Sequence, residues 1–70
     1  MTTIADVVRL ESAWRVARVA VEVNSTERAM RAEEEAWDAY TEACHAIDQC
    51  LHPGCREKVP GESYCPAHRN

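Results

Sequence analysis

The sequence has no phenylalanine and only two glycines and three prolines among its 70 residues. Aromatic residues make up 6% of the chain, and alanine supplies much of the 46% that is hydrophobic, so we expect a thin core. A domain of this size buries a modest fraction of its surface and usually needs a disulfide, a metal ion or a partner subunit for stability. We therefore expect one domain that depends on such a stabilising element.

Long apolar runs are also missing. No stretch approaches the roughly 18 consecutive apolar residues of a membrane span. Asp6, Arg9 and Glu11 interrupt the apolar residues near the N-terminus, so we expect no secretory signal peptide. A cytoplasmic, intracellular location is the expectation, and clustered cysteines there bind metal more often than they pair.

Excess positive charge is absent, because the formal net charge is −4. Residues 1–24 are neutral, residues 25–49 carry two arginines against seven acids (−5), and residues 50–70 carry three basic residues against two acids (+1). Overall acidity disfavours nucleic acid as the main partner, because phosphate neutralisation supplies most of that affinity.

Neither glycine nor proline occurs between residues 3 and 49, and this Ala-, Arg- and Glu-rich stretch predicts helix. A first apolar stripe at spacings of three and four residues comprises Ile4, Val7, Leu10, Trp14, Ala17 and Val21. A second comprises Met30, Trp37, Tyr40, Cys44, Ile47 and Leu51. The second stripe is about 200° out of phase with the first, so one straight helix would carry apolar faces on opposite sides.

A break near residue 25 resolves this conflict. Asn24 with Glu27 has the spacing of a capping box, and Ser25 or Thr26 could cap equally well. Folding the chain back there places large residues opposite each other at numbers that sum to 51, such as Val7 with Cys44 and Trp14 with Trp37. The prediction is a mainly α fold, an antiparallel coiled-coil-like hairpin with helices at about 3–23 and 26–50.

Some apolar residues of the first helix lie off this seam, namely Val8, Val16, Val19 and Val23. They require either the tail or another chain to cover them. A homodimer that forms a four-helix bundle through the helices is the expectation that we favour.

The tail contains the pattern C-x4-C-x9-C-x2-H, formed by Cys50, Cys55, Cys65 and His68. Structural zinc takes four tetrahedral N/S ligands, usually as two close pairs, so we expect one Zn²⁺ here. Residues 50–70 would form a zinc-finger-like module. This module would pack on the hairpin of residues 1–49, and the two would make one structural domain. Cys50 would end the second helix. Residues 56–64 are expected to form a β-hairpin with a type II turn at Pro60-Gly61.

Other interpretations of the cysteines remain open at this point. His52 is a rival fourth ligand to His68. The four cysteines could instead form disulfides, or hold an iron–sulfur cluster with Cys44 in place of His68. Four available ligands, three of them thiolates, favour a closed structural zinc site over a catalytic one.

The residues "CLHPGC" and "YCPAHR" resemble the small zinc-binding module that precedes the nuclease domain in bacteriophage HNH-type endonucleases. The resemblance covers about the last 20 residues and implies that Cys50, Cys55, Cys65 and His68 are metal ligands. It also implies a phage or mobile-element protein. Nuclease activity is not implied, because the HNH catalytic domain is missing.

The sequence predicts a non-enzymatic, zinc-stabilised regulatory protein that binds a partner protein, with the transcription or replication machinery as one candidate. Its partner-binding surface would be the acidic face of the second helix, formed by Glu27, Glu34, Asp38 and Glu42. The alternative is a nucleic-acid-binding zinc protein that uses Arg56, Lys58 and Arg69 in the tail.

Overall fold

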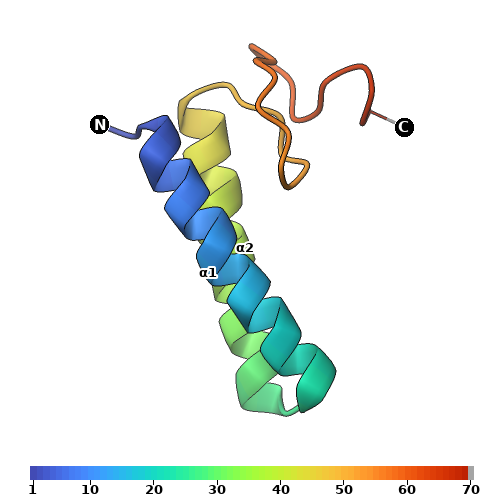
Figure 1. Cartoon of the computed structure of the whole chain (residues 1–70). Coiled ribbons are helices and arrows are strands. Elements are labelled where there is room, and N and C mark those ends of the chain that lie inside the picture. The colour runs from blue at the N-terminus through green and yellow to red at the C-terminus, as the bar shows by residue number, and fades with distance from the viewer. Residues whose placement is uncertain (70) are drawn as a thin grey trace.

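The computed structural model describes residues 1–69 and contains two α-helices, α1 (Ile4–Val23) and α2 (Glu27–Ala46). The helices lie antiparallel and side by side, and the tail folds against the end of the pair opposite the turn (Figure 1). The predicted helical hairpin is therefore confirmed. Within residues 1–69, neither helix combines the length and the apolar composition of a membrane span.

Hydrogen-bonding caps fix where both helices begin. Thr3 and Asp6 form a reciprocal capping box at the start of α1, and the Thr26 hydroxyl accepts the Ala29 N–H at the start of α2. The expected capping box at Asn24 does not form, because Asn24 instead caps the C-terminus of α1 by donating its N–H to the Ala20 carbonyl at 2.9 Å. Thr26, one of the alternatives, is the N-cap of α2.

The second helix ends at Ala46, earlier than the predicted residue 50. Asp48 adopts a left-handed conformation with φ of 54°, and its N–H donates to the His45 carbonyl while the Gln49 N–H donates to the Cys44 carbonyl. These two bonds make a Schellman motif, which closes the helix with an aspartate where glycine is usual. Cys50 therefore follows the helix in an irregular segment and does not end it.

The predicted register of the hairpin is confirmed at its centre. The Trp14 and Trp37 ring centroids lie 4.9 Å apart. Arg18 Nη1 and Glu33 Oε1 form an ion pair at 3.4 Å, and these residue numbers also sum to 51. The core beside them comprises Val7, Tyr40, Ala43, Cys44 and Leu51.

The prediction of a β-hairpin at residues 56–64 is wrong: no β-hairpin forms within residues 1–69. The Pro60-Gly61 turn does form, with Gly61 at φ of 76° and the Glu62 N–H donating to the Val59 carbonyl. Its two flanks bond to residues 48–51 instead of to each other: Val59 N–H donates to Asp48 O, and Leu51 N–H donates to Ser63 O. The segment 48–51 thus lies between them, and only an isolated bridge joins Gln49 to Lys58.

The tail packs on the hairpin through a second small core. It comprises Cys50, Val59 and Cys65, and the half-buried Tyr64 contacts both this core and the helical one. The predicted module of residues 50–70 is thus described up to residue 69, and Asn70 lies outside the described residues.

Replacing Val7 with alanine should lower the free energy of unfolding by about 2 kcal/mol, because Val7 is fully buried in the helical core and the substitution leaves a cavity. The control Glu35→Ala, at an exposed residue of α2, should change it by less than about 0.5 kcal/mol. Urea unfolding followed by tryptophan fluorescence measures both, and equal effects would contradict this description of the core.

Candidate metal centre

Two short turns bring the first pair of ligands together and return the chain towards the second. Pro53-Gly54 forms a turn in which the Cys55 N–H donates to the His52 carbonyl at 3.0 Å and Gly54 has φ of 88°. A positive φ of this kind is the reason for a glycine at the third position of a type II turn. Pro60-Gly61 repeats the same turn five residues beyond Cys55.

The ligand atoms of Cys50, Cys55, Cys65 and His68 all lie within 4.8 Å of one another. The Cys55 and Cys65 sulfurs are 3.8 Å apart, and His68 Nδ1 lies 3.6 Å from Cys50 Sγ and 3.2 Å from Cys65 Sγ. A tetrahedral ion with metal–sulfur bonds of about 2.3 Å and a metal–nitrogen bond of about 2.0 Å would place sulfurs about 3.8 Å apart and nitrogen about 3.5 Å from sulfur. The group therefore fits one metal ion.

The cluster is partly buried. Cys50 and Cys65 are buried, while Cys55 and His68 are partly exposed. Burial raises the pKa of the Cys50 thiol, but hydrogen bonds from the backbone N–H groups of Cys65 and His52 outweigh it and lower the pKa below its ordinary value. The Cys65 N–H lies 3.4 Å from Cys50 Sγ. Amide donors of this kind stabilise a thiolate, which is the form that binds metal.

The rival residues lie outside the cluster. The His52 ring stacks on the His68 ring, with centroids 3.9 Å apart and planes 8° from parallel, and its Nδ1 lies 3.0 Å from the Pro53 carbonyl oxygen. His52 therefore packs against His68. Cys44 packs in the helical core, and the four cysteines are free thiols. Sequence reasoning correctly brought the Cys3His group together, and the structure gives Cys44 no part in it.

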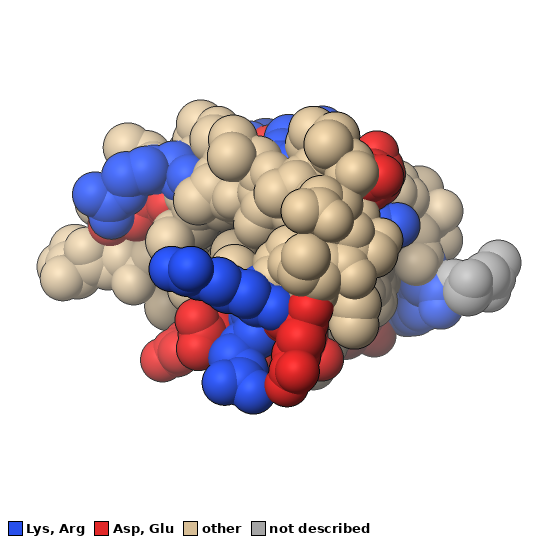
Figure 2. Space-filling view, turned by 90° about the horizontal axis from the view of Figure 1, so that it is seen from below, with Lys and Arg blue, Asp and Glu red and all other residues tan. Residues whose placement is uncertain are grey.

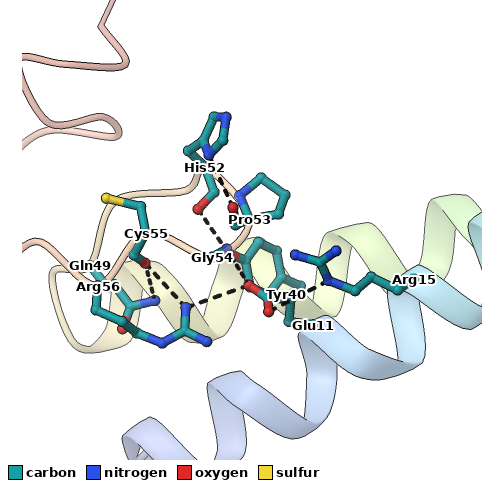
Figure 3. Close-up of polar contacts among 9 residues, drawn as sticks. All are labelled: Glu11, Arg15, Tyr40, Gln49, His52, Pro53, Gly54, Cys55 and Arg56. Carbon is teal, nitrogen blue, oxygen red and sulfur yellow. Dashed lines mark hydrogen bonds and ion pairs between the residues drawn. The ribbon is translucent and has the colours of Figure 1, made fainter.

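Glu11 joins α1 to the metal-site loop, and sequence reasoning missed this role (Figure 3). Its Oε1 accepts the Gly54 N–H at 2.6 Å and faces Arg56 Nη1 at 3.4 Å, while Oε2 lies 3.6 Å from Arg15 Nε. Burial raises the pKa of Glu11, but the hydrogen bonds from Gly54 and Arg56 and the charges of both arginines lower it below its ordinary value of 4.5. An acid immediately after the partly buried stripe residue Leu10 was the signal available in the sequence.

Two polar side chains of the second helix and its end hold the same loop. Tyr40 donates its hydroxyl to the His52 carbonyl at 3.4 Å, and Gln49 donates its side-chain amide to the Cys55 carbonyl at 3.2 Å (Figure 3). Both side chains are fully buried. The backbone that carries Cys55 is thus fixed from α1, α2 and the segment after α2.

The three basic residues of the tail each have a partner within the fold. Arg56 bonds to Glu11 and to the Cys55 carbonyl, Lys58 Nζ donates to the Ile47 carbonyl at 2.8 Å, and Arg69 pairs with Glu62 at 3.0 Å. Lys58 thereby satisfies a carbonyl at the C-terminal end of α2. The charged groups of all three side chains are thus bonded within the fold.

The acidic residues expected to bind a partner lie along the exposed side of α2. Glu27 pairs with Arg31 at 3.4 Å. Within residues 1–69, no ion pair involves Glu34, Asp38 or Glu42, so these three carboxylates leave part of the helix with uncompensated negative charge.

No protein-family model, curated protein or solved structure matches the chain.

Replacing Glu11 with glutamine should lower the free energy of unfolding at neutral pH by about 1–3 kcal/mol, because a buried carboxylate with charge-assisted bonds to Gly54 and Arg56 becomes neutral. The control Glu22→Gln removes an ion pair to Arg18 between two exposed side chains and should cost less than about 1 kcal/mol. Chemical denaturation compares the two, and equal costs would contradict a specific role for Glu11.

The effect of Glu11→Gln should depend on pH. Because the folded-state pKa of Glu11 lies below 4.5, its charge stabilises the fold fully above that pH, and this contribution is lost as the pH falls through the folded pKa. The difference in unfolding free energy between the wild type and Glu11→Gln should thus shrink below about pH 4.5. A difference that is independent of pH from neutrality to pH 3 would contradict this assignment.

Proposed function

We propose that the Cys3His cluster holds one structural Zn²⁺. The observation that supports this most is the convergence of three sulfurs and one imidazole nitrogen within 4.8 Å of one another, with the Cys55–Cys65 and Cys50–His68 distances close to those around a tetrahedral ion. Four protein ligands leave no open position for water or substrate, as in structural zinc sites. When bound, zinc would link the two halves of the tail, and its binding free energy would contribute to folding.

The donor set favours zinc over other metals. Thiolate and imidazole ligands in a tetrahedral arrangement suit Zn²⁺, whereas magnesium and calcium prefer oxygen ligands. An iron–sulfur cluster on four cysteines would need Cys44, whose side chain is buried between the helices. The charge of three thiolates and Zn²⁺ would sum to −1, and the amide donor at Cys50 would partly offset it.

The protein that this site stabilises is, in our proposal, a non-enzymatic interaction protein. Its partner-binding surface is the acidic side of α2, where Glu34, Asp38 and Glu42 are exposed. Unpaired carboxylates on a helix suit a partner with a basic surface, because complementary charge speeds association and selects the partner. The resemblance of the tail to a phage module supports a phage or mobile-element origin, with host or viral transcription or replication machinery as the partner class.

Nucleic-acid binding is the second candidate. It rests on Arg56, Lys58 and Arg69, whose charged groups are already bonded to Glu11, the Ile47 carbonyl and Glu62. Contacts to phosphate would compete with these bonds, so the geometry favours this function less than protein binding.

Native mass spectrometry should find one zinc ion per chain. Cys65→Ser should lose the metal because it removes a ligand, whereas Cys44→Ser, the matched control at the cysteine outside the cluster, should keep it. His68→Ala should likewise weaken zinc binding far more than His52→Ala. Metal loss from the Cys44 variant with retention in the Cys65 variant would contradict the ligand assignment.

The proposed partner surface is tested by capture from the native host, followed by binding of the purified partner. Charge reversal of Glu34, Asp38 and Glu42 to lysine should abolish binding, and the control Glu22→Lys on α1 should preserve it. Micromolar binding of DNA or RNA that weakens steeply with salt would instead support the nucleic-acid function. Loss of that binding on substitution of Arg56, Lys58 and Arg69 would then overturn the main proposal.

A further inference from the structure

The outer side of α1 is apolar, although it faces away from the hairpin core. Val16, Val19 and Val23 expose 72%, 56% and 81% of their surface, and Val8 exposes 41%. With Ser12 they form a stripe at spacings of four, four, three and four residues, which lies on one side of the helix, opposite Val7 and Trp14. The tail does not cover this stripe, since it folds against the end of the hairpin opposite the turn (Figure 1).

Only the inner side of α1 packs against another helix. Trp14 on that side contacts Trp37 of α2, and α1 and α2 are the two helices of the described residues. The four valines on the outer side stay exposed, so no part of residues 1–69 covers them. Stable domains usually bury an apolar helix face against a second packed element, which another molecule would have to supply here.

Charge indicates what that molecule is. The arginines beside the stripe are paired within α1, Arg15 with Glu11 and Arg18 with Glu22, so the face carries no unpaired charge that selects a charged partner. The uncompensated acids lie on α2 instead. Two chains that meet through α1 place their acidic α2 faces on the outside of the pair, where their repulsion is smallest. Viewed from the turn, a broad uncharged surface lies beside clustered charged side chains (Figure 2).

A lipid surface fits this face less well. Helices that bind in the membrane interface carry Trp, Phe or Leu on the apolar side and excess Lys or Arg on the polar side. The α1 stripe consists of valines with one serine, and α1 as a whole carries three arginines against three acids. Small β-branched side chains instead form a flat surface that lets another helix pack closely.

We propose that the outer face of α1, formed by Val8, Val16, Val19 and Val23, is a homodimer interface that joins two hairpins into a four-helix bundle. The interface is isologous, so each chain contributes the same stripe. It is independent of zinc binding and of the partner proposed for α2. The dimer presents two acidic α2 faces on opposite sides, so it would bind two copies of a partner.

Sedimentation equilibrium of the zinc-loaded full chain tests this proposal. The wild type should have twice the 7.9 kDa mass of one chain. The double variant Val16→Glu/Val19→Glu should be monomeric, with a dimer dissociation constant raised at least about 100-fold, because two carboxylates would be buried without partners. Ala32→Glu, the matched control at an exposed alanine of α2, should remain a dimer.

Far-UV circular dichroism and zinc content should be unchanged in the double variant, since both valines are exposed in one chain. If it fails to fold, Val16→Ser/Val19→Ser provides the same comparison without added charge and should also weaken the dimer. A monomeric wild type would overturn the proposal, whether or not that monomer co-sediments with lipid vesicles. A dimer that survives both double variants, or one that Ala32→Glu disrupts, would also overturn it.

Discussion

The convergence of Cys50, Cys55, Cys65 and His68 is the constraint on which the tail depends. The described residues after α2 contain no helix and only one isolated β-bridge, so no regular secondary structure orders them. Two of the three residues in the tail's small core, Cys50 and Cys65, belong to the Cys3His group. Without a bound ion, the few buried apolar side chains of the tail and its hydrogen bonds to the hairpin would have to offset the conformational entropy of ordering the whole segment, at about 1–2 kcal/mol per residue for the backbone alone.

Glu11 extends this constraint to the helices. Its carboxylate holds the Gly54 turn between the first two cysteines, and the buried Tyr40 and Gln49 bond to the carbonyls of His52 and Cys55. The metal site is thus built into the open end of the hairpin. That arrangement leaves the long faces of both helices free, apolar on α1 and acidic on α2, which is where the proposed interactions lie.

The sequence predicted the repetitive part of the fold well, because helical periodicity constrains many residues at once. That periodicity predicted the pairing of Trp14 with Trp37. The spacing of the cysteines and histidine in the tail predicted the Cys3His group. The sequence did not predict the end of α2, because Asp48 occupies a left-handed position at which a glycine would have indicated that the helix stops. The β-hairpin failed for a related reason: Pro60-Gly61 specifies a turn, but tertiary bonds to residues 48–51 decide what its flanks pair with. Glu11 was missed because its partners are distant in sequence.

X-ray absorption at the zinc edge of the purified protein measures which atoms surround the metal. A structural Cys3His site should give one shell of three sulfurs at about 2.3 Å and one imidazole nitrogen at about 2.0 Å, with no bound water. The Cys44→Ser variant should give the same spectrum, because Cys44 lies in the helical core. A coordination shell dominated by oxygen, or a fully folded protein that contains no zinc, would contradict a structural zinc site formed by these four residues.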